Sequence, residues 1–125
     1  MDDIYQQNIL DHYKHPHHKG ALLVCDIKEE GANPSCGDEL TLFLKFDNDG
    51  RIVDVGYEGN GCDISQAAMS MLSDKITEKT MEEAAAISDK DMFELLGIAI
   101  GSGREKCALL GVHTLQRALK QDSLS

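Results

Sequence analysis

The spacing of apolar and polar residues changes along the chain from a helical period to a strand period and back. Residues 2–14 carry apolar and aromatic side chains at helical spacing, and a proline ends the predicted helix. Residues 22–30 alternate with a period of two, which places Leu23, Cys25 and Ile27 on one face of a half-buried strand. We therefore expect Cys25 to be a core thiol, because unligated cysteine behaves as a small buried hydrophobe.

A hairpin is the clearest pattern in the middle of the chain. Residues 40–46 are largely apolar, a polar turn follows at residues 47–50, and residues 51–58 alternate with a period of two. The glycine-rich elbow Gly59-Asn60-Gly61-Cys62 then leads into a helix whose apolar stripe begins at Ile64. Two strands joined by a short polar turn pair antiparallel, so the sheet is expected to be antiparallel.

The remaining residues predict helices. Thr80 with Glu83, and Ser88 with Asp91, have the spacing of capping boxes, each of which starts a short helix. A last amphipathic helix begins near Arg104. This order of elements predicts an α+β fold, a small antiparallel three-stranded sheet with helices packed on one face.

Length and charge narrow the classes of protein. The 125 residues suit one domain, spanning residues 1–125. With 22 acidic and 12 basic residues the net charge is −10, which disfavours nucleic acid and anionic membranes as partners. The chain shows neither a spanning apolar run nor an export signal, so we expect a cytoplasmic protein with reduced thiols.

Three of the four cysteines lie beside glycines or at predicted helix starts. Cys36 and Asp38 flank a glycine in the turn that begins at Asn33, and their anionic side chains converge most readily on a cation. Cys62 and Cys107 open helices, where free N–H groups stabilise a thiolate. Together these four residues suit zinc or an iron cluster, and the spacing leaves open which, as well as the alternative of three unrelated buried thiols.

Histidines cluster after the first predicted helix, at His15, His17 and His18. They could hold a second metal ion, but adjacent histidines in a loop are more often solvated, and we favour that interpretation.

Four motifs along the chain resemble those of a known family. They are Asp11-His12-Tyr13 with Pro16 and Gly20, Asn33-Pro34-Ser35-Cys36-Gly37-Asp38, Gly59-Asn60-Gly61-Cys62 with Ile64-Ser65, and Lys106-Cys107. In this order, and across almost the whole chain, they resemble the IscU/SufU/NifU family of iron–sulfur cluster assembly proteins.

The resemblance implies a scaffold that accepts persulfide sulfur from a cysteine desulfurase of the SufS, IscS or NifS kind. It would combine the sulfur with iron and transfer the nascent cluster to apo-protein acceptors. By match, Cys36, Asp38, Cys62 and Cys107 would ligate either zinc or a [2Fe-2S] cluster at the same site. Cys36 and Cys107 would be the candidate sulfur acceptors.

Two departures from the family patterns keep alternatives open. Lys106 stands where IscU proteins have a histidine, and the run 98–103 differs from their chaperone motif, so the ligands look SufU-like. The 44 residues between Cys62 and Cys107 leave no room for the usual SufU insertion, so the length looks IscU-like. The first alternative to a scaffold is therefore a zinc-dependent sulfurtransferase that stimulates the desulfurase, which would make the chain an enzyme. The second is a structural zinc module.

Overall fold

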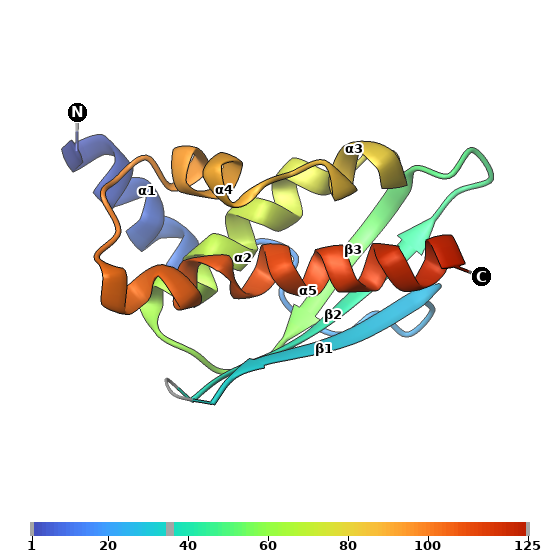
Figure 1. Ribbon diagram of the computed structural model, residues 1–125, viewed down its shortest axis with the longest axis horizontal. Coiled ribbons are helices and arrows are strands. Elements are labelled where there is room, and N and C mark those ends of the chain that lie inside the picture. The colour runs from blue at the N-terminus through green and yellow to red at the C-terminus, as the bar shows by residue number, and fades with distance from the viewer. Residues whose placement is uncertain (1, 35–36, 125) are drawn as a thin grey trace.

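The structure is a computed structural model that describes the backbone of residues 2–34 and 37–124 and the side chains of residues 4–34 and 37–120. Its strands are β1 (Ile27–Asn33), β2 (Asp38–Phe46) and β3 (Ile52–Glu58), which form one antiparallel sheet in the order β1-β2-β3 (Figure 1). Its helices are α1 (Asp2–Lys14), α2 (Asp63–Ile76), α3 (Met81–Ala85), α4 (Asp89–Leu96) and α5 (Glu105–Leu124), with a short 3-10 turn η1 (Ser102–Arg104) before α5.

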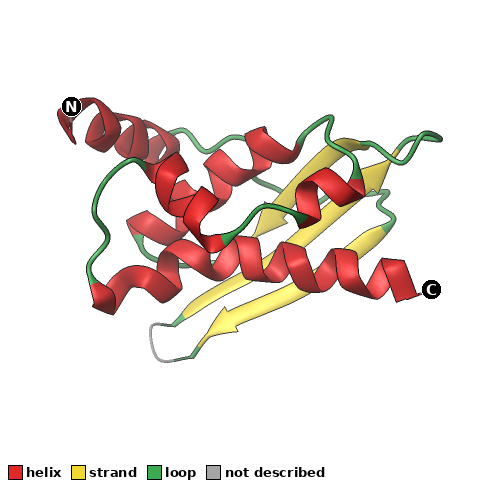
Figure 2. Ribbon diagram, turned by 45° about the horizontal axis from the view of Figure 1, so that its top comes forward, coloured by secondary structure: helices red, strands yellow, loops and turns green. Residues whose placement is uncertain are grey.

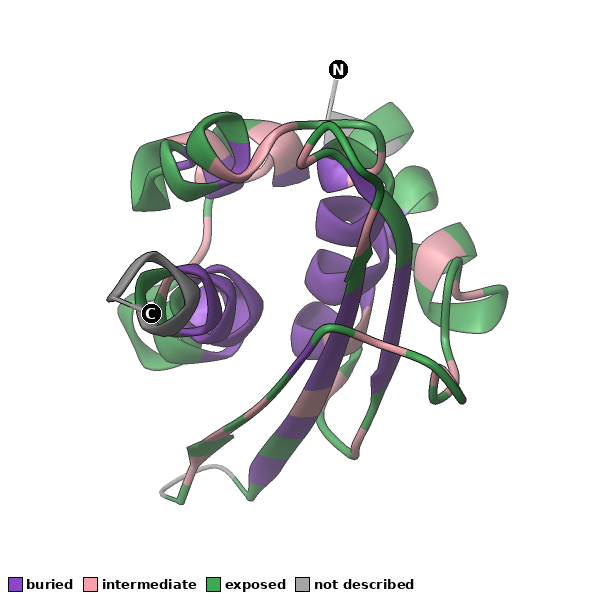
Figure 3. Ribbon diagram, turned by 90° about the vertical axis from the view of Figure 1, so that its right-hand side faces the viewer, coloured by how far each residue is buried: buried purple, intermediate pink, exposed green. Residues whose placement is uncertain are grey.

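The helices cover one face of the sheet, as predicted. Helix α5 lies across β1 and β2, α2 contacts β3 and α5, and α1 packs against α2 (Figure 2). The strand residues that face the helices are buried, and Leu42 and Leu44 of β2 have no exposed surface (Figure 3). The α+β class and the three-stranded antiparallel sheet are therefore confirmed.

The local signals for helix starts are confirmed as well. Thr80 and Ser88 each accept a hydrogen bond from the backbone N–H three residues later, and the acidic residue there accepts one in return. The apolar stripe of α2 is buried in the core, where Leu72 has no exposed surface. No helix among the described residues is long and apolar enough to cross a membrane.

The predicted strand at residues 22–30 is wrong in its first half. Strand β1 begins only at Ile27, Leu23 is 103% exposed, and Cys25 is half-buried rather than a core thiol. The pairing partner explains the difference. Ile27 lies opposite Leu44, and β2 ends only two residues later at Phe46, so most of residues 22–26 have no strand to pair with.

Candidate metal centre

The end of β1 lies beside the start of β2. Asn33 and Asp38 lie opposite each other at the ends of the strands, and the Gly37 N–H donates to the Asn33 carbonyl at 2.9 Å. Gly37 has a φ of 74°, a left-handed conformation that favours glycine. The predicted ligand Cys36, with Ser35, lies outside the described residues.

Asp38 is a buried carboxylate with an incomplete set of partners. It is 2% exposed, and its Oδ1 accepts a hydrogen bond from the Cys62 N–H at 3.2 Å. Its Oδ2 is buried without a hydrogen-bond partner in the described part of the chain. Burying an anionic oxygen without a partner is costly. A cation next to Oδ2 would remove that cost.

The elbow before α2 brings Cys62 to this carboxylate. Asn60 exchanges two backbone hydrogen bonds with Glu39, at 2.8 and 3.1 Å, which hold the elbow against the start of β2. A Cβ at Gly61 would lie 2.2 Å from Ser65 Oγ and 2.9 Å from Asp38 Oδ1. Glycine at this position therefore permits the close approach, and Cys62 follows it as the N-cap of α2.

Cys107 reaches the same point from the first turn of α5. It is 5% exposed, and the N–H groups at the start of a helix favour an anionic side chain there. The Asn33 side-chain amide donates to the Lys106 carbonyl at 2.8 Å, which ties the β1–β2 hairpin to the start of α5. This tether joins two segments that are 73 residues apart in the sequence.

The structure thus gathers three of the four predicted site residues. Asp38, Cys62 and Cys107 each offer a ligand atom, and these atoms lie within 4.8 Å of one another. In a tetrahedral zinc shell, with metal–ligand distances of about 2.0–2.3 Å, the ligand atoms are about 3.3–3.8 Å apart. Two sulfurs and one carboxylate oxygen at this spacing fit either zinc or the iron of a cluster after a small contraction.

The guanidinium of Arg104 also acts on the Cys62 thiol. Burial tends to raise the pKa of Cys62, but hydrogen bonds from Arg104, from the Ser65 backbone and from Cys107 outweigh burial, so the pKa lies below its ordinary value. Arg104 also pairs with Asp63, and its own pKa is raised by Cys62 and Asp63. The guanidinium therefore favours the thiolate form of Cys62, which is the form that binds metal.

Replacing Arg104 with alanine should move the alkylation of Cys62 to higher pH. The thiolate loses its hydrogen-bonding cation, so its pKa rises and less thiolate is present near neutral pH. The measurement is the rate of iodoacetamide labelling of Cys62 against pH, followed by peptide mass spectrometry on metal-free protein. Arg117→Ala is the matched control, because Arg117 contacts the Glu30 carbonyl instead. If the pH dependence of Cys62 labelling is unchanged in Arg104→Ala, Arg104 does not stabilise the Cys62 thiolate.

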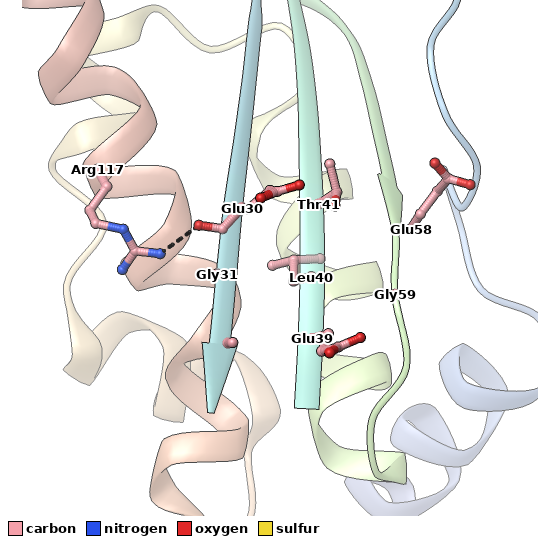
Figure 4. A pocket seen from close by; sticks show the side chains of 9 residues that line it. Glu30, Gly31, Glu39, Leu40, Thr41, Glu58, Gly59 and Arg117 are labelled. Carbon is pink, nitrogen blue, oxygen red and sulfur yellow. Dashed lines mark hydrogen bonds between the residues drawn. The ribbon is translucent and has the colours of Figure 1, made fainter. Parts of the chain in front are cut away.

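An open groove of about 690 Å³ lies elsewhere, along the strands (Figure 4). Its lining includes Glu30, Glu39 and Glu58, and none of the described cysteines. Arg117 donates to the Glu30 carbonyl at its rim. Among the residues that line the groove, the only side chains of a metal-ligating type are carboxylates. We therefore assign the groove no part in the chemistry of the thiols.

Fold and site together define a class of small α+β proteins in which an aspartate and two cysteines gather where a hairpin meets two helix starts. The chain belongs to the family of the NifU-like N terminal domain, whose family model matches residues 4–122.

Relatives of known name lie on both branches of this family. The chain is 35% identical to a Streptococcus pyogenes protein named iron-sulfur cluster assembly scaffold protein IscU, over 98% of this chain and 87% of that protein. It is 34% identical to the zinc-dependent sulfurtransferase SufU of Bacillus subtilis, over 98% of this chain and 93% of that protein. A crystal structure described as a putative SUF-system scaffold from Fervidobacterium islandicum superimposes with a TM-score of 0.77 at 34% identity, over 94% of this chain and 97% of that chain.

Sequence reasoning missed two supports of the site. The first is the Asn33 side chain, whose contact with Lys106 crosses from the hairpin to α5. In the sequence Asn33 is marked only by its position directly before the proline of the turn, which does not indicate a contact with Lys106. The second is Ser65, whose hydroxyl donates to the Cys62 carbonyl at 3.0 Å and so steadies the first turn of α2.

Proposed function

We propose that this chain is an iron–sulfur cluster assembly scaffold. It accepts persulfide sulfur from a cysteine desulfurase, holds a nascent [2Fe-2S] cluster, and passes it to apo-protein acceptors. The observation that carries the proposal is the convergence of Asp38, Cys62 and Cys107, with one Asp38 oxygen buried and unpartnered among the described residues. Membership of the NifU-like family and the similarity to proteins named as scaffolds support it.

The ligands of the cluster would be Cys36, Asp38, Cys62 and Cys107. Cys36 completes the set on the basis of the sequence motif. A ligand set of thiolates plus one carboxylate suits transient storage, because a hard oxygen binds the iron of a cluster less firmly than sulfur does. The cluster is cargo here, and Asp38 is the ligand through which it would leave.

Sulfur enters by thiol–disulfide-type exchange. A thiolate of this chain attacks the outer sulfur of the desulfurase persulfide, a new S–S bond forms, and the desulfurase cysteine leaves as a thiolate. No electron is gained or lost in this exchange. Later reduction of the bound sulfur to sulfide takes electrons from ferrous iron, which becomes ferric, and from a thiol reductant.

Anaerobic reconstitution tests the scaffold proposal. The metal-free chain is mixed with a cysteine desulfurase, cysteine, ferrous iron and a thiol reductant, and an apo-ferredoxin is added afterwards. We expect a visible absorption spectrum typical of a [2Fe-2S] cluster, followed by its appearance in the ferredoxin. A chain that never acquires the spectrum, although the desulfurase releases sulfide, would overturn the proposal.

A second candidate is a zinc-dependent sulfur acceptor that stimulates the desulfurase. It is favoured by Lys106, which stands directly before Cys107 where a histidine ligand would be, and by the similarity to SufU. Zinc would hold the thiols, and one of them would leave the metal to attack the persulfide. Metal analysis of the purified chain, together with desulfurase turnover with and without it, separates the two: zinc with strong stimulation supports this candidate, and iron with a transferable cluster supports the scaffold.

A purely structural zinc ion is the weakest of the alternatives. The described core is continuous from the sheet through α2 to α5 and includes side chains with no exposed surface, such as Leu42, Leu72 and Leu115. A core of this size does not depend on a metal ion, unlike that of a small zinc module. The ligands also come from a hairpin turn and two helix starts rather than from tight paired-cysteine knuckles.

A further inference from the structure

A second group of ligand-type side chains lies beside the later turns of α2. His12 of α1, His17 of the connector and Asp74 of α2 each offer a ligand atom, and these atoms lie within 4.8 Å of one another. Asp74 follows Cys62 by twelve residues, which corresponds to about 18 Å along a helix at about 1.5 Å per residue. The group is therefore separate from the thiol centre.

The buried Ser70 hydroxyl holds the His12 imidazole and the backbone of His17. Its Oγ accepts a hydrogen bond from the His17 backbone N–H at 2.8 Å and lies 2.7 Å from His12 Nδ1. In the tautomer with its proton on Nδ1, His12 donates to Ser70 and leaves Nε2 as a ligand nitrogen. Histidine ligands commonly give their other N–H to a protein acceptor in this way.

The Asp74 carboxylate faces histidines with both of its oxygens. His17 Nδ1 lies 2.6 Å from Oδ2, and His18 Nε2 lies 3.1 Å from Oδ1. His18 has a φ of 62°, a left-handed conformation uncommon for residues other than glycine. His15, His17 and His18 are exposed, as predicted for a solvated loop, but His17 and His18 also share one carboxylate.

We propose that His12, His17 and Asp74 form a second binding site for a divalent transition-metal ion such as zinc. Two imidazole nitrogens and one carboxylate oxygen are ligands that suit zinc and its first-row neighbours. The side chains of His17 and Asp74 are exposed, so an ion can enter between them by replacing their mutual hydrogen bond after a small movement. Three protein ligands leave a fourth position for water or for a ligand from a partner.

Zinc titration of the metal-free chain tests the site. We expect isothermal titration calorimetry to show one more zinc ion bound to the wild-type chain than to His17→Asn. Asp74→Asn should weaken the same step by about tenfold or more, the scale on which loss of even a supporting residue acts. His15→Asn is the matched control, because His15 is an exposed histidine of the same connector and lies outside the group. It should bind as much zinc as the wild type.

Cobalt distinguishes this site from the thiol centre. Cobalt bound by thiolates gives an intense sulfur-to-metal charge-transfer band, and cobalt bound by imidazole and carboxylate does not. We expect His17→Asn to keep the charge-transfer band and to lose only the one additional cobalt ion that the wild type binds. The proposal is overturned if His17→Asn and Asp74→Asn both bind as much zinc as the wild type with unchanged affinity, or if the wild type binds only the metal that gives the thiolate band. Far-ultraviolet circular dichroism verifies that both variants fold.

Discussion

Replacing Asp38 with alanine should give a cluster that persists longer after anaerobic reconstitution. Asp38 supplies the hard oxygen of the proposed ligand set, and a carboxylate exchanges more readily than a thiolate. In the variant a thiol from the buffer can fill the open position and hold the iron more firmly. A tenfold slower decay of the visible absorption would correspond to a barrier higher by about 1.4 kcal/mol.

The matched control for this experiment is Glu39→Ala. Glu39 is the next residue of β2, but its side chain is exposed and lines the groove of Figure 4. Its cluster should decay at the wild-type rate. If the Asp38→Ala cluster decays as fast as the wild-type cluster, Asp38 does not set the lability.

For the second candidate function, the zinc-dependent sulfur acceptor, replacing Cys36 with serine should abolish stimulation of the cysteine desulfurase. A serine hydroxyl is not ionised near neutral pH and does not attack a persulfide, so sulfur stays on the desulfurase. The measurements are alanine release with and without the chain, and the mass of the persulfidated chain. Zinc content is determined in parallel, because loss of a ligand also weakens metal binding.

Cys25→Ser is the control for this substitution. Cys25 is half-buried in the segment before β1 and is not part of the Asp38 group, so its loss should leave stimulation intact. Cys107→Ser tests the rival acceptor. Full stimulation by Cys36→Ser, with none by Cys107→Ser, would make Cys107 the acceptor instead.

Much of the fold follows from local signals. The hairpin, the stripe of α2 and the two capping boxes are all encoded within a few neighbouring residues, and each is found where expected. The start of β1 is different, because it depends on where β2 ends. A period of two at Leu23 and Cys25 indicates which side chains share a face, but only a pairing strand decides whether that face is buried.

The two groups of ligand-type side chains show the same limit of sequence-based prediction. Glycines and helix starts point to Asp38, Cys62 and Cys107 one at a time, and the fold alone shows that their ligand atoms meet. At the histidines the sequence draws attention to the connector, yet the carboxylate that faces His17 and His18 lies more than fifty residues away, on α2. No spacing rule connects residues that meet only through the packing of α1 on α2.

The amide of Asn33 couples two parts of the candidate site. Because it holds the Lys106 carbonyl, which directly precedes Cys107, a displacement of the end of β1 is transmitted to the first turn of α5. A contact made at Asn33 alone would therefore also change the position of Cys107, to which Asn33 is linked through this hydrogen bond.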